Sequence, residues 1–171
     1  MIYSGLLEGL NSGRSAMSED TKIDEAQCCC GQVSLKFTGG PKKVLACSCD
    51  YCQRRTGSII QFSAWYTADQ IVSQTGEVKH YQGPNNPGVD YMFCPECGST
   101  VYWEIPGLTA LYGSRLYGVA VGNFADRDYP QPTMENFVSN RHHWLGDVGT
   151  EETNAEVSPF IVEALQAGMS D

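Results

Sequence analysis

The sequence predicts a mainly β fold: a single domain of short antiparallel strands with at most one short helix, near the C-terminus. Short runs rich in β-branched and aromatic residues alternate with turn sequences such as TGGP, QTGE and GPNNPG. The 18 glycines and 8 prolines leave little room for long helices. At 171 residues the chain has the length of one domain, and no linker or internal repeat divides it.

The expected strands follow one another along the chain, each bounded by turn residues. They are residues 33–37, 44–47, 59–65, 78–81, 99–105, 117–121 and 135–138. The segment SPFIVEALQAG then favours a short helix, with Ser158 as its N-cap and Pro159 at its first position. We expect residues 1–22 to be a flexible extension, residues 23–150 the folded β domain and residues 151–171 a C-terminal tail.

Composition limits the partners and the compartment. A net charge of −9 argues against nucleic-acid and anionic-membrane partners, because both need a basic surface. No apolar run has the length of a membrane span, and the opening MIYSGLLEGLNSGR lacks the basic region of a signal peptide. We therefore expect a cytoplasmic protein with reduced thiols, in which eight cysteines are metal ligands rather than disulfides.

The cysteine pair in FCPECGS is the most specific motif. Cys94 and Cys97, followed by Gly98, form a tight turn that directs both sulfurs to one point. This is half of a tetrahedral four-thiolate zinc site. The alternative is a redox pair, but such pairs usually begin a helix, whereas the flanking residues here are typical of strands.

The first cysteine group, CCCG, can supply the other half. In an extended chain Cys28 and Cys30 point the same way and Cys29 points the opposite way. A closed site of four thiolates would be structural, and its binding energy would be folding energy. We expect Cys29 to be a small buried hydrophobic residue. The alternative is that it closes the remaining cysteine group as a fourth thiolate.

That remaining group, CSCDYC, holds Cys47, Cys49 and Cys52 within six residues. Three protein ligands and one open position are typical of a catalytic or ligand-exchanging zinc. The candidates for the fourth ligand are Cys29, a histidine, an acidic residue, water or a substrate. A substrate thiol is attractive because zinc removes the proton of a coordinating thiol.

Taken together, the motifs CxCG, CSCDYCQRRTG, FCPECGS and VAVGNFAD resemble the glutathione-dependent formaldehyde-activating enzyme family, which includes the centromere protein V relatives. The resemblance implies a β-tent fold with two zincs: a structural one on Cys28, Cys30, Cys94 and Cys97, and a reactive one on Cys47, Cys49 and Cys52. It also implies a carbon–sulfur lyase that condenses formaldehyde with glutathione to S-(hydroxymethyl)glutathione. The chain departs from the family pattern at Ser48 and Glu135, where family members often carry histidine.

Charged and aromatic residues near these motifs have two interpretations. Arg54 and Arg55 could bind the carboxylates of glutathione, or pack back on the zinc loop. Trp65, Trp103 and Trp144 are expected mainly in the core, although Trp65 could line a pocket. The adjacent pair His142 and His143 is expected in a surface loop.

Three functions remain open. The first is an enzyme that joins a thiol such as glutathione to a small aldehyde. The second is a non-catalytic, zinc-stabilised binding module, and the third is a thiol-based metal or redox sensor. A three-cysteine site favours the first and the third. The absence of a basic tail argues against binding to microtubules or chromatin.

Overall fold

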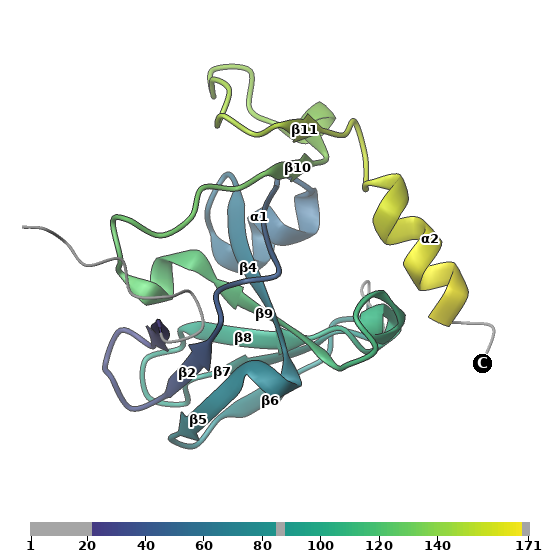
Figure 1. The fold of residues 1–171 in the computed structure, drawn as a ribbon. Helices are drawn as coiled ribbons and strands as arrows, with labels where there is room; N and C mark the ends of the chain where they lie inside the picture. The colour runs from purple at the N-terminus through teal and green to yellow at the C-terminus, as the bar shows by residue number, and fades with distance from the viewer. Residues whose placement is uncertain (1–21, 85–87, 169–171) are drawn as a thin grey trace, which may run out of the picture.

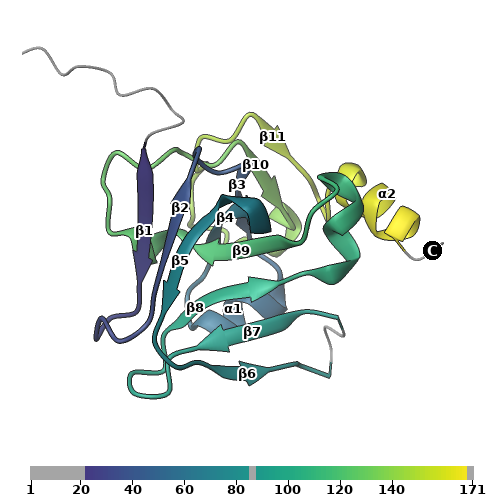
Figure 2. The same cartoon turned by 60° about the horizontal axis from the view of Figure 1, so that its bottom comes forward.

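The fold contains two β-sheets, and the smaller one carries the first cysteine group, Cys28 to Cys30, at one end. The computed structural model describes residues 22–84 and 88–168, so the expected extension lies outside the described residues except for Lys22. Three antiparallel strands form this sheet in the order β1–β2–β5, side by side in Figure 2: β1 Ile23–Gln27, β2 Ser34–Thr38 and β5 Ile71–Thr75.

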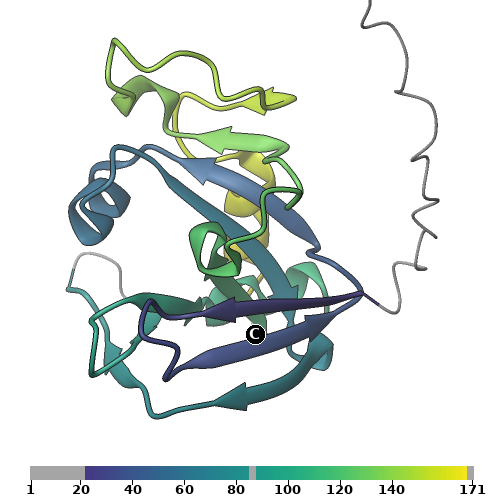
Figure 3. The ribbon, with the colours of Figure 1, turned by 90° about the vertical axis from the view of Figure 1, so that its left-hand side faces the viewer.

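A larger sheet of eight strands forms the rest of the β structure, in the order β11–β10–β3–β4–β9–β8–β7–β6. Its neighbours are antiparallel except that β10 runs parallel to both β3 and β11. In Figure 3, β10 and β11 (green to yellow) lie on the opposite side of the molecule from β1 and β2 (purple). The mainly β prediction is confirmed. The strands are β3 Lys43–Cys47, β4 Gln61–Thr67, β6 Lys79–Tyr81, β7 Asp90–Phe93, β8 Thr100–Glu104, β9 Leu116–Ala120, β10 Met134–Asn136 and β11 Glu152–Thr153.

Both faces of the large sheet are buried at its central strands, because alternate side chains there enter two different cores. On β4, Ala64 and Tyr66 pack with Phe37 of the small sheet, while Trp65 between them packs on the other side. The second core is closed by two helical segments, α2 (Pro159–Gly168) and the 3₁₀ helix η3 (Pro106–Leu111). Figure 1 shows α2 (yellow) beside the sheet.

Residues 151–168, the described part of the tail expected over 151–171, contribute structure to the domain. β11 pairs with β10, and Ile161 and Ala164 of α2 pack into the second core at the three-residue spacing of an amphipathic helix. The carbonyl of Ser158 accepts from the Ile161 N–H at 3.0 Å, so the helix begins where expected. The Ser158 hydroxyl donates instead to Glu152, at 3.1 Å.

One short helix was not expected from the sequence. α1 (Asp50–Thr56) begins at Cys49, whose sulfur accepts from the Cys52 N–H at 3.4 Å, and ends at Gly57 in a left-handed conformation. A cysteine replaces the usual oxygen cap of a helix N-terminus, so the start signal was missed. The remaining helical segments are the 3₁₀ helices η2 Ala68–Gln70, η4 Val121–Phe124 and η5 Val138–Asn140. Within the described ranges no helix has both the length and the apolar character needed to cross a membrane.

Candidate metal centres

Four cysteines from two distant turns form one compact group. The sulfurs of Cys28, Cys30, Cys94 and Cys97 all lie within 4.8 Å of one another. The Sγ atoms of Cys28 and Cys30 are 3.5 Å apart, and those of Cys30 and Cys94 are 3.7 Å apart. Tetrahedral zinc with Zn–S bonds of ~2.3 Å places its sulfurs about 3.8 Å apart. The donor set therefore fits a closed four-thiolate metal site.

Two similar turns present these sulfurs. The Gly31 N–H donates to the Cys28 carbonyl at 2.9 Å, and the Gly98 N–H donates to the Cys94 carbonyl at 2.9 Å. Both glycines have positive φ, 78° and 73°, a conformation that side chains disfavour. Because β1 ends at Gln27, the turn rather than an extended chain brings the first pair together, which corrects the geometry expected from the sequence.

Within this group, hydrogen bonding to the Ser99 side chain and backbone lowers the pKa of Cys97 to about 5. The Val33 N–H also donates to the Cys28 sulfur at 3.2 Å. Both contacts favour the thiolate forms that a metal requires.

Cys29 is exposed, and the expectation that it would be buried is wrong. It lies in the turn between the two ligand candidates, where its N–H donates to the Ser99 hydroxyl at 3.3 Å and its side chain faces solvent. Among the described residues it belongs to neither cysteine group. The structure thus contradicts the alternative in which Cys29 closes the second group.

The second group consists of Cys47 at the end of β3, Cys49 at the helix cap and Cys52 in the first turn of α1. Their sulfurs lie within 4.8 Å of one another, and all three side chains are half-buried. Hydrogen bonds from Cys47 and Cys52 lower the pKa of Cys49 to about 2, while the same contact with Cys49 raises the pKa of Cys47. The start of α1 therefore brings three soft donors together, with hydrogen bonds that favour the thiolate form of Cys49.

Ser48 and Glu135, where the chain departs from the pattern of the family that it resembles, form a hydrogen bond beside the three-cysteine group. The Ser48 hydroxyl donates to Glu135 Oε1 at 3.2 Å. Arg141 donates from Nε to the same oxygen at 3.0 Å and from Nη2 to Oε2. Glu135 is 0% exposed, so its charge is balanced entirely inside the protein. It braces the loop between Cys47 and Cys49 and is not among the grouped metal donors.

A cavity of about 220 Å³ borders the three-cysteine group at Cys47 and Cys52. One face of the large sheet forms its floor, through alternate residues of β3 and β4. Residues of α1, β7, β8 and β10, the segments following β10, and the helical segments η3 and α2 form the rest. The lining residues are Leu45, Cys47, Cys52, Arg55, Gln61, Ser63, Trp65, Val89, Tyr91, Trp103, Ile105, Leu108, Asn136, Phe137, Val157, Ile161 and Leu165.

Arg55 supplies the positive charge of this cavity. Its guanidinium carbon lies 4.4 Å from the ring centre of Tyr91 and 5.0 Å from that of Trp103. Its Nη2 donates to Gln61 Oε1 at 3.1 Å, and its Nε is buried without a hydrogen-bond partner among the described residues. Stacking on two rings fixes the guanidinium beside the cavity.

Arg54, expected beside Arg55 as a substrate ligand, lies elsewhere. Its side chain is 81% exposed, pairs with Asp50 at 3.4 Å and does not line the cavity. One turn of α1 cannot direct two adjacent residues to the same side, so the structure separates the two arginines.

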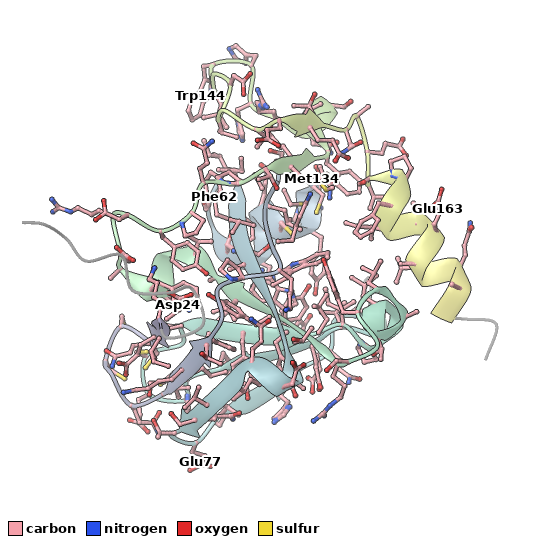
Figure 4. All side chains as sticks on the ribbon, in the orientation of Figure 1. Asp24, Phe62, Glu77, Met134, Trp144 and Glu163 are labelled. Carbon is pink, nitrogen blue, oxygen red and sulfur yellow. The ribbon has the colours of Figure 1, made fainter. Side chains whose placement is uncertain are left out.

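The three tryptophans differ in burial and in their position relative to the cavity. Trp65 and Trp103 are buried and line the cavity. Trp144 is 62% exposed in the outer loop labelled in Figure 4, so the expectation of a core position is wrong there. The Trp144 ring lies near that of the exposed His142, at 5.3 Å between ring centres.

The fold and the two thiol groups define a mainly β protein with two cysteine centres able to hold metal ions. The chain belongs to the glutathione-dependent formaldehyde-activating enzyme family, whose sequence model matches residues 24–140. This membership relates the chain to glutathione and formaldehyde activation at the level of the family. The match ends before β11 and α2. No curated protein matches the chain.

Proposed function

We propose that the protein is a zinc-dependent carbon–sulfur lyase of the S-(hydroxymethyl)glutathione synthase type, which joins a thiol such as glutathione to a small aldehyde. One observation carries this proposal: the three-cysteine group borders a cavity, whereas the other group already has four sulfurs. A centre with three protein ligands can accept a substrate as its fourth ligand. Family membership supports the same reaction.

Both donor sets consist of thiols, which suit zinc. Cys28, Cys30, Cys94 and Cys97 would hold the structural ion. Cys47, Cys49 and Cys52 would hold the reactive one. Zinc bound there would supply deprotonation of a substrate thiol at neutral pH.

The residues around the reactive centre have separate tasks in the addition. A carbon–sulfur bond forms, the carbonyl π bond breaks, and the thiol proton ends on the former carbonyl oxygen, with no change of oxidation state. Arg55 lines the cavity, and its guanidinium charge stabilises the negative charge that develops on that oxygen. The aromatic walls exclude water from the same space.

The test is acceleration of formaldehyde–glutathione exchange by the zinc-loaded protein, measured by NMR line broadening. We expect faster exchange with the native protein. Cys49→Ser should lose one zinc of two and the acceleration, while its circular dichroism stays native. No acceleration with two zincs bound would contradict the enzyme and favour the binding module or the thiol-based sensor.

Arg55→Met should lower kcat/KM by about a hundredfold, the typical effect of removing one donor to a developing oxyanion. Methionine keeps an apolar stem between Tyr91 and Trp103, so the cavity wall is retained. Arg54→Met, on the exposed side of the same helix, should change kcat/KM by no more than about threefold. Equal losses in the two variants, measured with two zincs bound, would argue against the role of Arg55.

A further inference from the structure

We propose that the cavity beside the three-cysteine group binds an apolar substituent on the aldehyde carbon. The preferred substrates are then aldehydes with a short alkyl or aryl chain. This inference rests on the proposed function and deepens it. Formaldehyde carries only hydrogens on its carbonyl carbon, so it leaves a cavity of about 220 Å³ unfilled.

The walls of the cavity match an apolar group in chemistry and in size. Trp65, Trp103, Leu108 and Ile161 are buried residues that line it together with Ile105. An apolar cavity of ~150 Å³ in another protein accommodates benzene. A volume of about 220 Å³ therefore has room for a single ring or a chain of several methylenes.

Part of the wall comes from the segment beyond the family match. Val157, Ile161 and Leu165 line the cavity from α2 and the residue stretch before it, after the match ends at residue 140. α2 is closely packed there: a Cβ added to Gly107 of η3 would lie 3.0 Å from Leu165 Cδ2. The apolar cover is thus supplied by this chain's own C-terminal region.

The opposite side of the cysteine group suits the thiol partner. Cys49 and Cys52 also border an open hollow whose polar lining includes Asp50, Asn140 and Glu156. Asn140 Nδ2 donates to Asp50 Oδ1 at 2.8 Å, which fixes one of the two carboxylates. Asp50 is also paired with Arg54 at 3.4 Å, so this hollow is polar and suits the polar groups of glutathione better than the apolar cavity does. The polar thiol therefore takes the open side, and the apolar cavity is left for the aldehyde.

With an aldehyde that carries an apolar substituent, the bonds formed and broken are the same as with formaldehyde. The thiol sulfur bonds to the aldehyde carbon, the carbonyl π bond breaks, and the thiol proton ends on oxygen. The product is a hemithioacetal, and the apolar substituent is unchanged.

Binding of non-reacting thioethers tests the inference without catalysis. Isothermal titration of the zinc-loaded protein would compare S-hexylglutathione with S-methylglutathione. Each buried methylene adds roughly fourfold in affinity, so partial burial of the longer chain predicts binding at least roughly thirtyfold tighter. Equal affinities would overturn the inference. Because no reaction is needed, a failure of formaldehyde activation would remove the proposed function and leave this measurement valid.

Two variants locate the preference in this cavity. Leu165→Glu places a charge at its α2 wall and should reduce the preference for the hexyl compound about tenfold. Ser63→Leu fills the cavity from β4 and should remove most of the preference for the hexyl compound. The control is Phe160→Glu, on the same helix but 45% exposed and outside the cavity lining, which should retain it. With native circular dichroism, an unchanged preference in Leu165→Glu and Ser63→Leu would overturn the assignment.

A kinetic comparison tests whether the cavity binds the apolar chain of the aldehyde or that of the thiol. The first reaction pairs hexanal with glutathione, and the second pairs formaldehyde with hexanethiol. We expect kcat/KM in the first to exceed that in the second, and Leu165→Glu to lower the first selectively. A higher kcat/KM in the second would overturn the placement of the aldehyde chain in the cavity.

Discussion

Cys94→Ser is expected to lower the free energy of unfolding by roughly 5 kcal/mol or more, which is comparable to the whole stability of a domain. Cys94 is 0% exposed. The four-cysteine group to which it belongs joins the turn after β1 to the turn between β7 and β8. With Cys94 gone, a metal bound there would keep only Cys97 as a ligand from the turn between β7 and β8, so it would be held more weakly between the two turns. Its binding energy, which the unfolded chain lacks, is then largely lost.

Denaturant unfolding together with metal analysis measures this effect. Cys49→Ser provides the matched comparison, because it also removes one metal ligand candidate but lies at the helix cap of the open group. We expect Cys49→Ser to unfold near the native midpoint with one zinc retained. Similar midpoints for Cys94→Ser and the native protein would contradict a structural role for the four-cysteine group.

Arg141→Met is expected to lower the free energy of unfolding by about 3 kcal/mol, because it leaves the carboxylate of Glu135 buried without its charge partner. The same change should weaken zinc binding at the three-cysteine group. Glu135 holds Ser48, and Ser48 lies between two of the three cysteines. Urea unfolding and competition with a zinc chelator measure the two effects.

An exposed ion pair supplies the control for Arg141. Lys36 pairs with Glu25 at 3.3 Å on the small sheet, with both side chains partly exposed. Lys36→Met should cost less than about 1 kcal/mol. Adding Glu135→Gln to Arg141→Met should recover part of the loss, since the uncompensated charge is removed. No recovery would show that the arginine stabilises the loop by packing alone.

Spacing along the chain was enough to predict both cysteine groups and the mainly β fold. Each half of a group consists of cysteines two or three residues apart, and a short turn brings such neighbours together by local geometry. The β-branched and aromatic residues of the segments that form β3 and β4 likewise mark strands before any partner is known. The exposed position of Cys29 was missed because turn and strand differ in side-chain direction over the same four residues.

The cavity and the buried brace could not be predicted in this way. Glu135 meets Ser48 because β10 pairs with β3 across more than eighty residues of chain. Val157 and Leu165 reach the cavity because α2 packs on the second core. Local spacing indicated which residues could hold a metal. Long-range packing, which no short pattern encodes, placed Arg55, Glu135 and the apolar walls around the three-cysteine group.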